Sequence, residues 1–189
     1  MVIIAEGPDN SGKSTQLQRI QHRLAKKGKP AHYLHYSAFK LPKDECITYS
    51  KKVYEGAFQL INSAISLEQS LIFDRLTGGE WVYGKIYRDY DAEYIYELED
   101  EYIRSVDQNL KHTYLIVFTD KAENLITRDD GLSYTSDMGW NMAMQKKEYE
   151  LARFYDFFLR SLIRNKLYLP ITGLNPDQVE ERIVNFLGV

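Results

Sequence analysis

The chain has 189 residues, of which 44% are hydrophobic and 27% charged, and its formal net charge is −3. This length predicts one domain, 1–189, with a core large enough to fold without disulfide or metal support. The acidic balance argues against polymeric nucleic acid as a partner, the single Cys46 cannot form an internal disulfide, and no apolar run approaches the roughly 20 residues that cross a bilayer. We therefore expect a cytoplasmic protein that does not contact a membrane.

The first predicted element is an apolar strand over 2–5, and a phosphate-binding loop follows it directly. Residues 7–14 read Gly-Pro-Asp-Asn-Ser-Gly-Lys-Ser and match the pattern GxxxxGK followed by Ser or Thr. In this motif the glycines let backbone N–H groups turn toward phosphate oxygens, the lysine reaches the β- and γ-phosphates, and the last hydroxyl binds Mg²⁺. A helix over about 14–27 supplies the strand–loop–helix setting that the motif requires. The residues expected to bind a nucleoside triphosphate are Gly7, Asn10, Ser11, Gly12, Lys13, Ser14 and Thr15.

Apolar strands and helices alternate along the rest of the chain. Further strands are expected over 31–36, 70–73, 114–118 and 167–171. Further helices are expected over about 44–67 and 137–164, and a last helix should run from Asn175 to a stop at Gly188. Three shorter helices are expected between these: one after a glycine-rich connection at 76–84, one that carries the acidic cluster 97–101, and one that begins near residue 122. Five apolar strands separated by helices predict an α/β fold, a five-stranded parallel sheet sandwiched between helices as in P-loop NTPases. The active site of such a sheet lies at the C-terminal ends of its strands.

Charged residues in three places allow both a structural and a functional interpretation. Asp74 and Arg75 directly follow the third strand, where they could form a simple ion pair or face a ligand. The polar stretch 127–136 predicts a short lid, and its Arg128 is either a solvated helix-end residue or a cation that reaches the transferring phosphate. The carboxylates of 97–101 are interpreted as a solvated helix face rather than a metal site, because contiguous residues on a helix point in different directions.

Three segments together resemble the thymidylate kinase-like nucleoside monophosphate kinases. They are residues 6–16, Glu-Gly-Pro-Asp-Asn-Ser-Gly-Lys-Ser-Thr-Gln, the strand end 73–75, Phe-Asp-Arg, and the lid around Arg128. Their order and spacing cover nearly the whole chain, and the stretch 74–84 looks most like members carried by bacterial viruses, which would place the protein in the host cytoplasm. The resemblance implies ATP-dependent phosphorylation of a deoxynucleoside monophosphate in dNTP synthesis, with dTMP first and dUMP or other deoxynucleotides as further acceptors. It also implies a homodimer.

The resemblance implies roles for individual residues as well. In that family the acidic residue third in the phosphate-binding loop, here Asp9, reaches the sugar hydroxyl of the acceptor. The equivalent of Arg75 binds the acceptor phosphate and the transferring group, which suits a reaction that depends on positioning and charge neutralisation. The implied catalytic residues are Lys13, Asp74, Arg75 and Arg128, and the implied metal ligands are Ser14 and Asp74. The implied substrate contacts are Asp9, Tyr54, Phe58, Arg75, Glu80, Trp81, Tyr83 and Arg88. The aromatic residues among these contacts are candidates to stack on the base.

The segment after the second strand bears on the kind of acceptor. A nucleoside hydroxyl is a poor nucleophile that needs a carboxylate base, whereas a phosphate monoester, with a second pKa of about 6, is already largely ionised at neutral pH. In the deoxynucleoside kinases, which the predicted architecture resembles, that base follows the second strand. Here residues 37–42 read Ser-Ala-Phe-Lys-Leu-Pro, with no carboxylate before Asp44. A monophosphate acceptor is therefore favoured, with Lys40 as a candidate phosphate contact. A deoxynucleoside kinase is the alternative enzyme, and a nucleotide-binding switch is the alternative outside enzymes, although no NKxD-type guanine-reading sequence is present.

Overall fold

The computed structural model describes residues 1–36, 43–105 and 109–189. Within these residues, five parallel strands form one sheet in the order β2–β3–β1–β4–β5. This sheet confirms the α/β class that the alternating pattern predicts. The strands are β1 (Val2–Glu6), β2 (Ala31–His35), β3 (Ser70–Asp74), β4 (Thr113–Thr119) and β5 (Asn165–Pro170).

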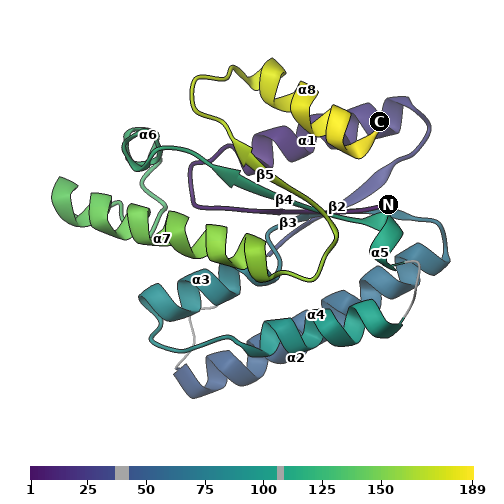
Figure 1. The fold of residues 1–189 in the computed structure, drawn as a ribbon, viewed down its shortest axis with the longest axis horizontal. Coiled ribbons are helices and arrows are strands. Elements are labelled where there is room, and N and C mark those ends of the chain that lie inside the picture. The colour runs from purple at the N-terminus through teal and green to yellow at the C-terminus, as the bar shows by residue number, and fades with distance from the viewer. Residues whose placement is uncertain (37–42, 106–108) are drawn as a thin grey trace.

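Helices cover both faces of this sheet, as Figure 1 shows. On one face, α1 (Lys13–Lys26) lies beside α8 (Pro176–Leu187). The remaining helices of the described residues are α2 (Lys43–Ser66), α3 (Thr77–Tyr87), α4 (Tyr94–Ser105), α5 (Asn109–His112), α6 (Ala122–Thr127) and α7 (Trp140–Arg160). The longer helices among these, α2, α3, α4 and α7, lie on the opposite face.

The central strand β1 is apolar because it is buried on both faces. Ile3 and Ala5 point to the side of α1 and α8, where they pack in one hydrophobic cluster with Leu17. Val2 and Ile4 point to the other side and belong to a second, larger cluster. A parallel strand between two helical layers reads as a continuous apolar run for this reason, and each aliphatic side chain buried in this way contributes roughly 1.5–3 kcal/mol.

The register of the strands aligns their C-terminal ends at one edge of the sheet. Ala5 of β1 and His35 of β2 both pair with Asp74 of β3, and Glu6 pairs with Val117 of β4. In Figure 1 the strands run from the right, where both termini lie, to the left, where α6 and the beginning of α7 lie. The polar residues that follow β1, β2 and β3 are therefore neighbours.

The sequence predicts a connection over the glycine-rich stretch 76–84, but residues 77–84 form the first eight of the eleven residues of α3. The reason is the buried Glu6, whose carboxylate accepts hydrogen bonds from the N–H groups of Leu76, Gly78 and Gly79 at 2.7–3.0 Å. At Gly78 a Cβ would lie 2.7 Å from the Phe157 ring and 2.8 Å from the Glu6 carboxyl carbon. Glycine is therefore needed here for close packing of the helix start.

The acidic cluster on α4 is only partly the solvated face that the sequence suggests. Glu97 and Glu101 are exposed, but Glu99 is fully buried. Its carboxylate accepts hydrogen bonds from the Leu162 N–H and the Ser161 hydroxyl, both at 3.0 Å. Glu99 therefore satisfies backbone and side-chain donors just after α7, which ends four residues earlier than expected.

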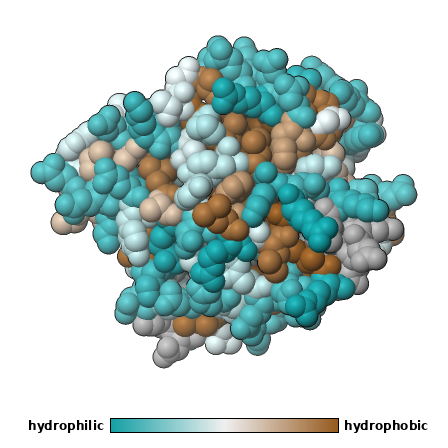
Figure 2. Space-filling view, in the orientation of Figure 1, coloured by the Kyte–Doolittle hydropathy of each residue, from teal (hydrophilic) through white to brown (hydrophobic). Residues whose placement is uncertain are grey.

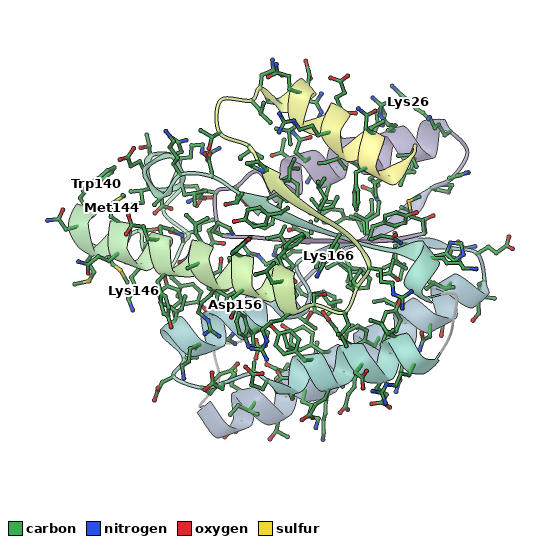
Figure 3. All side chains as sticks on the ribbon, viewed as in Figure 1. Lys26, Trp140, Met144, Lys146, Asp156 and Lys166 are labelled. Carbon is green, nitrogen blue, oxygen red and sulfur yellow. The ribbon has the colours of Figure 1, made fainter. Side chains whose placement is uncertain are left out.

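The surface is mostly hydrophilic on the face drawn in Figure 2, with separate hydrophobic patches near the centre of the view. Figure 3 shows Trp140 and Met144 at the beginning of α7, away from the sheet. Within the described residues, no helix combines the length and the apolar character that crossing a membrane requires. The exposed apolar side chains on α7 and directly after it are Trp140, Met142, Tyr149, Tyr155, Leu159 and Leu162.

Candidate active site

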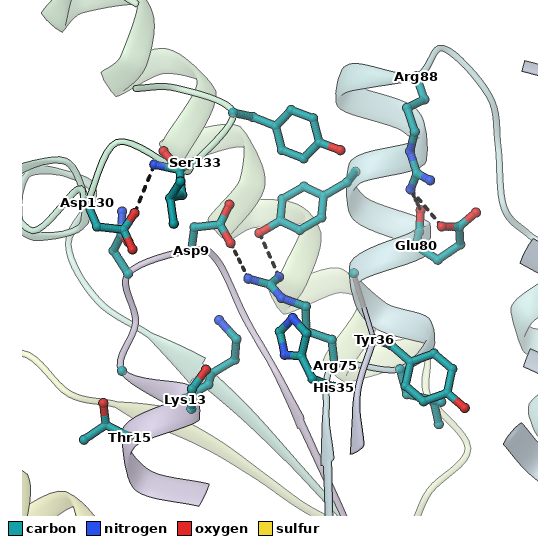
Figure 4. A pocket seen from close by; sticks show the side chains of 18 of the residues that line it. Asp9, Lys13, Thr15, His35, Tyr36, Arg75, Glu80, Arg88, Asp130 and Ser133 are labelled. Carbon is teal, nitrogen blue, oxygen red and sulfur yellow. Dashed lines mark hydrogen bonds and ion pairs between the residues drawn. The ribbon is translucent and has the colours of Figure 1, made fainter. Parts of the chain in front are cut away.

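A cavity of about 820 Å³ opens at the edge of the sheet where the strands end. The phosphate-binding loop, the ends of β2 and β3, helices α2 and α3 and the segment after α6 form its wall, part of which Figure 4 shows from close by. The predicted site residues that line it are Asp9, Asn10, Gly12, Lys13, Ser14, Thr15, Tyr54, Arg75, Glu80, Tyr83 and Arg88. The lining residues that sequence reasoning missed are His35, Tyr36, Leu76, Gly79, Asp130, Leu132, Ser133 and Tyr134.

The phosphate-binding loop requires glycine at its two ends. Gly7 has a φ of 134°, and a Cβ there would lie 2.4 Å from the Phe118 carbonyl oxygen. Gly12, the N-cap of α1, has a φ of 73°. Asn10 is also left-handed, with a φ of 66°, which asparagine tolerates better than most residues. These conformations bend the loop so that the first turn of α1 faces the cavity.

Lys13 is folded back onto its own loop. Its Nζ donates to the Pro8 carbonyl oxygen at 2.6 Å and to the Ser11 hydroxyl at 3.2 Å, and only 4% of the residue is exposed. Burial and the nearby charge of Arg75 lower the pKa of Lys13 to about 7, although the Asp9 carboxylate opposes this shift. A phosphate group in the cavity would supply the negative charge that favours the ammonium form. Lys13 is thus placed to bind an anion.

Ser14 and Asp74, the two predicted metal ligands, are in direct contact. The Ser14 hydroxyl donates to Asp74 Oδ2 at 2.5 Å, and the same oxygen accepts from the Tyr33 hydroxyl at 2.6 Å and lies 3.1 Å from His35 Nδ1. Burial raises the pKa of Asp74, but hydrogen bonds from Ser14 and Tyr33 outweigh it and hold that pKa below its ordinary value. The other carboxylate oxygen, Oδ1, is buried and has no hydrogen-bond partner among the residues that the structure describes.

These two oxygen donors fit Mg²⁺. The described residues contain no group of three or more His, Cys, Asp or Glu side chains that could hold a metal, so the protein does not provide a full set of ligands here. Mg²⁺ in phosphoryl-transfer sites takes one or two protein oxygens and completes its shell with water and substrate phosphates. An ionised Asp74 with an unpartnered oxygen beside the Ser14 hydroxyl has the donor chemistry that this arrangement requires.

Arg75 and Asp9 form an ion pair in the middle of the cavity, which Figure 4 shows. The Arg75 guanidinium donates to Asp9 Oδ1 and, through its other Nη, to the Tyr83 hydroxyl at 3.3 Å. Arg75 has a left-handed backbone with a φ of 72°. This conformation is uncommon for a residue other than glycine and turns the side chain into the cavity directly after β3.

A second ion pair, between Glu80 and Arg88 of the α3 region, lies on another side of the cavity (Figure 4). Arg88 Nη2 donates to Glu80 Oε2 at 2.8 Å, and the Tyr90 and Tyr94 hydroxyls donate to the other carboxylate oxygen. Glu80 is almost fully buried, and 13% of the Arg88 side chain is exposed. The pair therefore forms a fixed polar surface, and Tyr54 of α2 lines the same cavity.

Comparison with known proteins identifies the fold. No family model and no curated protein matches the sequence. A structure of thymidylate kinase from Ehrlichia chaffeensis aligns with a TM-score of 0.69 at 15% identity and covers 99% of this chain and 98% of its own. Two structures of deoxyadenosine kinase from M. mycoides also align, each covering 100% of this chain and 99% of its own. The structure with bound dCTP has a TM-score of 0.59 at 20% identity. The structure with the products dCMP and dCDP has a TM-score of 0.61 at 17% identity. The chain therefore shares the α/β P-loop fold of these two kinases.

Two of the predicted aromatic contacts lie in the core of this kinase fold instead of the cavity. Phe58 packs against Tyr102, with ring centroids 5.0 Å apart, and is 6% exposed. Trp81 is 1% exposed, its indole N–H donates to Glu93 at 3.1 Å, and the Arg153 guanidinium covers its ring at 3.8 Å from the centroid. The helical positions of both rings turn them toward neighbouring helices, so neither lines the cavity.

Arg128, the predicted lid cation, follows α6 directly and does not line the cavity. Its guanidinium donates to the Asp120 carboxylate and to the Asn124 carbonyl oxygen. Asp120 also accepts from the Thr172 hydroxyl at 2.6 Å. In this structure Arg128 is therefore bound at the base of the lid, beside the ends of β4 and β5.

The lid itself connects α6 to α7 and folds against the phosphate-binding loop. The Asp129 carboxylate accepts from Asn10 Nδ2 at 3.4 Å and from the Ser133 hydroxyl at 3.0 Å. The contribution of the lid to the cavity is not a cation but Tyr134, with Asp130, Leu132 and Ser133. Lys40 and the carboxylate-free segment 37–42 lie outside the described residues.

Proposed function

We propose that the protein transfers the γ-phosphoryl group of ATP to a deoxynucleoside monophosphate, with dTMP as the first candidate acceptor. The observation that carries this proposal is a single cavity with Lys13 and Ser14 in one part and the Asp9–Arg75 pair in another. A nucleotide-binding switch would need the first part alone. The second part offers an acceptor its own cation and carboxylate, and the shared fold with a thymidylate kinase agrees with a phosphotransferase.

On the donor side, Lys13 would bind the β- and γ-phosphates of ATP. Ser14 and Asp74 would hold Mg²⁺, which neutralises phosphate charge when bound. Arg128 is the one cation of the lid segment 127–136. It would reach the transferring group by exchanging its partner Asp120 for phosphate, so we propose that it acts only after such an exchange.

On the acceptor side, Arg75 would bind the acceptor phosphate and Asp9 would accept a hydrogen bond from the sugar hydroxyl. The Glu80–Arg88 pair offers both acceptors and donors to the edge of a base. Tyr54, which lines the same cavity, offers the face of its ring for base stacking. A phosphate oxygen of the acceptor would attack the γ-phosphorus, the bond from that phosphorus to the β-phosphate oxygen would break, and ADP would leave.

The balance of charge in the cavity supports one alternative, a deoxynucleoside kinase. Its lining includes three cationic side chains, Lys13, Arg75 and Arg88, and the carboxylates of Asp9, Glu80 and Asp130. Both arginines are already paired with a carboxylate. A monophosphate would bring up to two more negative charges, whereas an uncharged nucleoside would not. The fold shared with a deoxyadenosine kinase fits this alternative equally well.

Thermal unfolding with a ligand panel separates the three functions, because a ligand that binds only the folded state raises Tm. The proposal predicts a rise with Mg²⁺ and a non-hydrolysable ATP analogue, and a separate rise with dTMP or another deoxynucleoside monophosphate. A rise with thymidine or another deoxynucleoside but with no monophosphate would establish the alternative kinase. A rise with triphosphates alone would contradict both kinases and indicate a switch.

We also propose a homodimer, for which the exposed Trp140, Tyr155, Leu159 and Leu162 along and just after α7 give physical support, since apolar patches favour association. Light scattering on the purified protein would test it, and a monomeric mass at micromolar concentration would contradict it. The likeness of the stretch 74–84 to members from bacterial viruses stays a prediction.

A further inference from the structure

Tyr134 is held on the inner side of the lid by a chain of contacts that leads to buried residues of α7. Its ring stacks on Tyr87 of α3, with centroids 4.3 Å apart and planes 8° from parallel, and lies 5.6 Å from the Tyr83 ring. The Tyr87 hydroxyl donates to Glu150 of α7, which is fully buried and paired with the buried Lys147 at 3.1 Å. The lid therefore docks on rings that are anchored in the interior, and Tyr134 is fixed in orientation.

The hydroxyl of this fixed ring is free to bind a ligand. Tyr134 lines the cavity and is 39% exposed, and its phenol makes no hydrogen bond within the described part of the chain. Burial raises the pKa of Tyr134. The cavity that Tyr134 lines also contains the two ion pairs that we assign to the acceptor, Asp9–Arg75 and Glu80–Arg88. The Tyr83 hydroxyl, on the ring beside Tyr134, accepts a hydrogen bond from Arg75, so Tyr134 lies on the acceptor side of the cavity.

We propose that Tyr134 is an acceptor-binding residue, whose hydroxyl forms a hydrogen bond with the acceptor between the Asp9–Arg75 and Glu80–Arg88 pairs. This inference rests on the proposed function and extends it to the lid. It follows that the acceptor, and not ATP alone, stabilises the closed lid. Because a closed lid excludes water, loss of this contact would also raise ATP hydrolysis relative to transfer.

Calorimetric binding to four forms of the protein tests the proposal. They are the wild type, Tyr134→Phe, Tyr134→Ala and Tyr149→Phe, the last a control because Tyr149 is exposed on α7 and does not line the cavity. The ligands are a non-hydrolysable ATP analogue and, separately, dAMP, dCMP, dGMP, dTMP and dUMP. Tyr134→Phe should weaken binding of the preferred monophosphate about three- to tenfold, the effect of one hydrogen bond. It should leave affinity for the ATP analogue within twofold, Tyr134→Ala should weaken the monophosphate further, and Tyr149→Phe should change neither.

The possible failures are distinguishable. If the wild type binds a monophosphate and Tyr134→Phe binds it with the same affinity, this inference is overturned and the proposed function stands. An equal loss of monophosphate and ATP analogue in Tyr134→Phe would also overturn it, because that result indicates a general effect on the lid. Wild-type binding of the ATP analogue but of no monophosphate would contradict the proposed function, and this inference with it.

Discussion

Glu6 accepts a hydrogen bond from the Gly78 N–H at 2.8 Å and so ties the end of β1 to the beginning of α3. Burial raises the pKa of this carboxyl group, and the backbone hydrogen bonds oppose that shift. The phosphate-binding loop begins directly after Glu6, and α3 carries Glu80 and Tyr83, which line the cavity. The hydrogen bonds of Glu6 therefore hold these two walls of the cavity next to each other.

A matched pair of glycine substitutions tests this packing. Gly78→Ala should destabilise the protein by about 1–3 kcal/mol, because its Cβ would overlap Phe157 and Glu6. Gly56→Ala, at an exposed position inside α2 where a Cβ meets nothing within 4 Å, should stabilise it by about 0.5–1 kcal/mol. Urea unfolding measures both changes, and equal effects of the two substitutions would show that α3 does not begin as described.

The buried Glu99 predicts a specific pH dependence of stability. Burial raises the pKa of Glu99 from 4.5 to about 7, so the folded state holds this proton more tightly than the unfolded chain does. The free energy of unfolding should therefore fall as pH rises from about 4.5 to about 7, by up to about 3 kcal/mol from this group, and then level off. Glu99→Gln should flatten this decline. The exposed Glu97→Gln on the same helix is the control, and identical pH profiles for the two variants would contradict the assignment.

Removing the charge of Asp74 should weaken the binding of Mg²⁺ to a measurable degree. Asp74→Asn keeps the size of the side chain but loses the carboxylate beside Ser14, so the Mg²⁺ concentration for half-maximal turnover should rise about tenfold or more. Asp177→Asn, which removes an exposed carboxylate of α8, should leave it unchanged. An unchanged Mg²⁺ dependence in Asp74→Asn would place the metal elsewhere.

Substitution of Arg75 by lysine tests the acceptor side. Lysine keeps the positive charge but cannot contact Asp9 and Tyr83 together, because it lacks the planar guanidinium. Arg75→Lys should raise KM for the acceptor at least about tenfold and lower kcat, since a group that positions the acceptor phosphate is lost. Arg104→Lys, on the exposed side of α4, is the control. Equal values of kcat and of KM for the acceptor in both variants would show that Arg75 does not take part in the reaction.

The sequence predicts the parts of the site that a short motif or a strand end defines. Residues 7–14 and the strand end Asp74-Arg75 could be placed together because parallel strands align their C-terminal ends. The same rule could have found His35, which ends β2 and pairs in register with Asp74. Local sequence patterns also predict the buried strand β1 and the end of α8 at Gly188, and both are present in the structure.

Residues whose role depends on packing between helices could not be predicted in this way. Whether Trp81 or Tyr83 faces the cavity depends on how α3 rotates against α7, and two rings two residues apart on one helix cannot both do so. Glu99 lies among exposed carboxylates in the sequence, yet it is buried by donors that are more than sixty residues away. The role of Tyr134 depends on an irregular lid whose path no periodic pattern records.

The most direct test of the central claim is a coupled assay of ADP formation with Mg-ATP, run against a panel of deoxynucleoside monophosphates and the matching deoxynucleosides. ADP should appear only when a monophosphate is present, in a one-to-one ratio with the corresponding diphosphate, and Lys13→Ala should abolish the signal. ADP formation that is the same with and without every acceptor in the panel would contradict it.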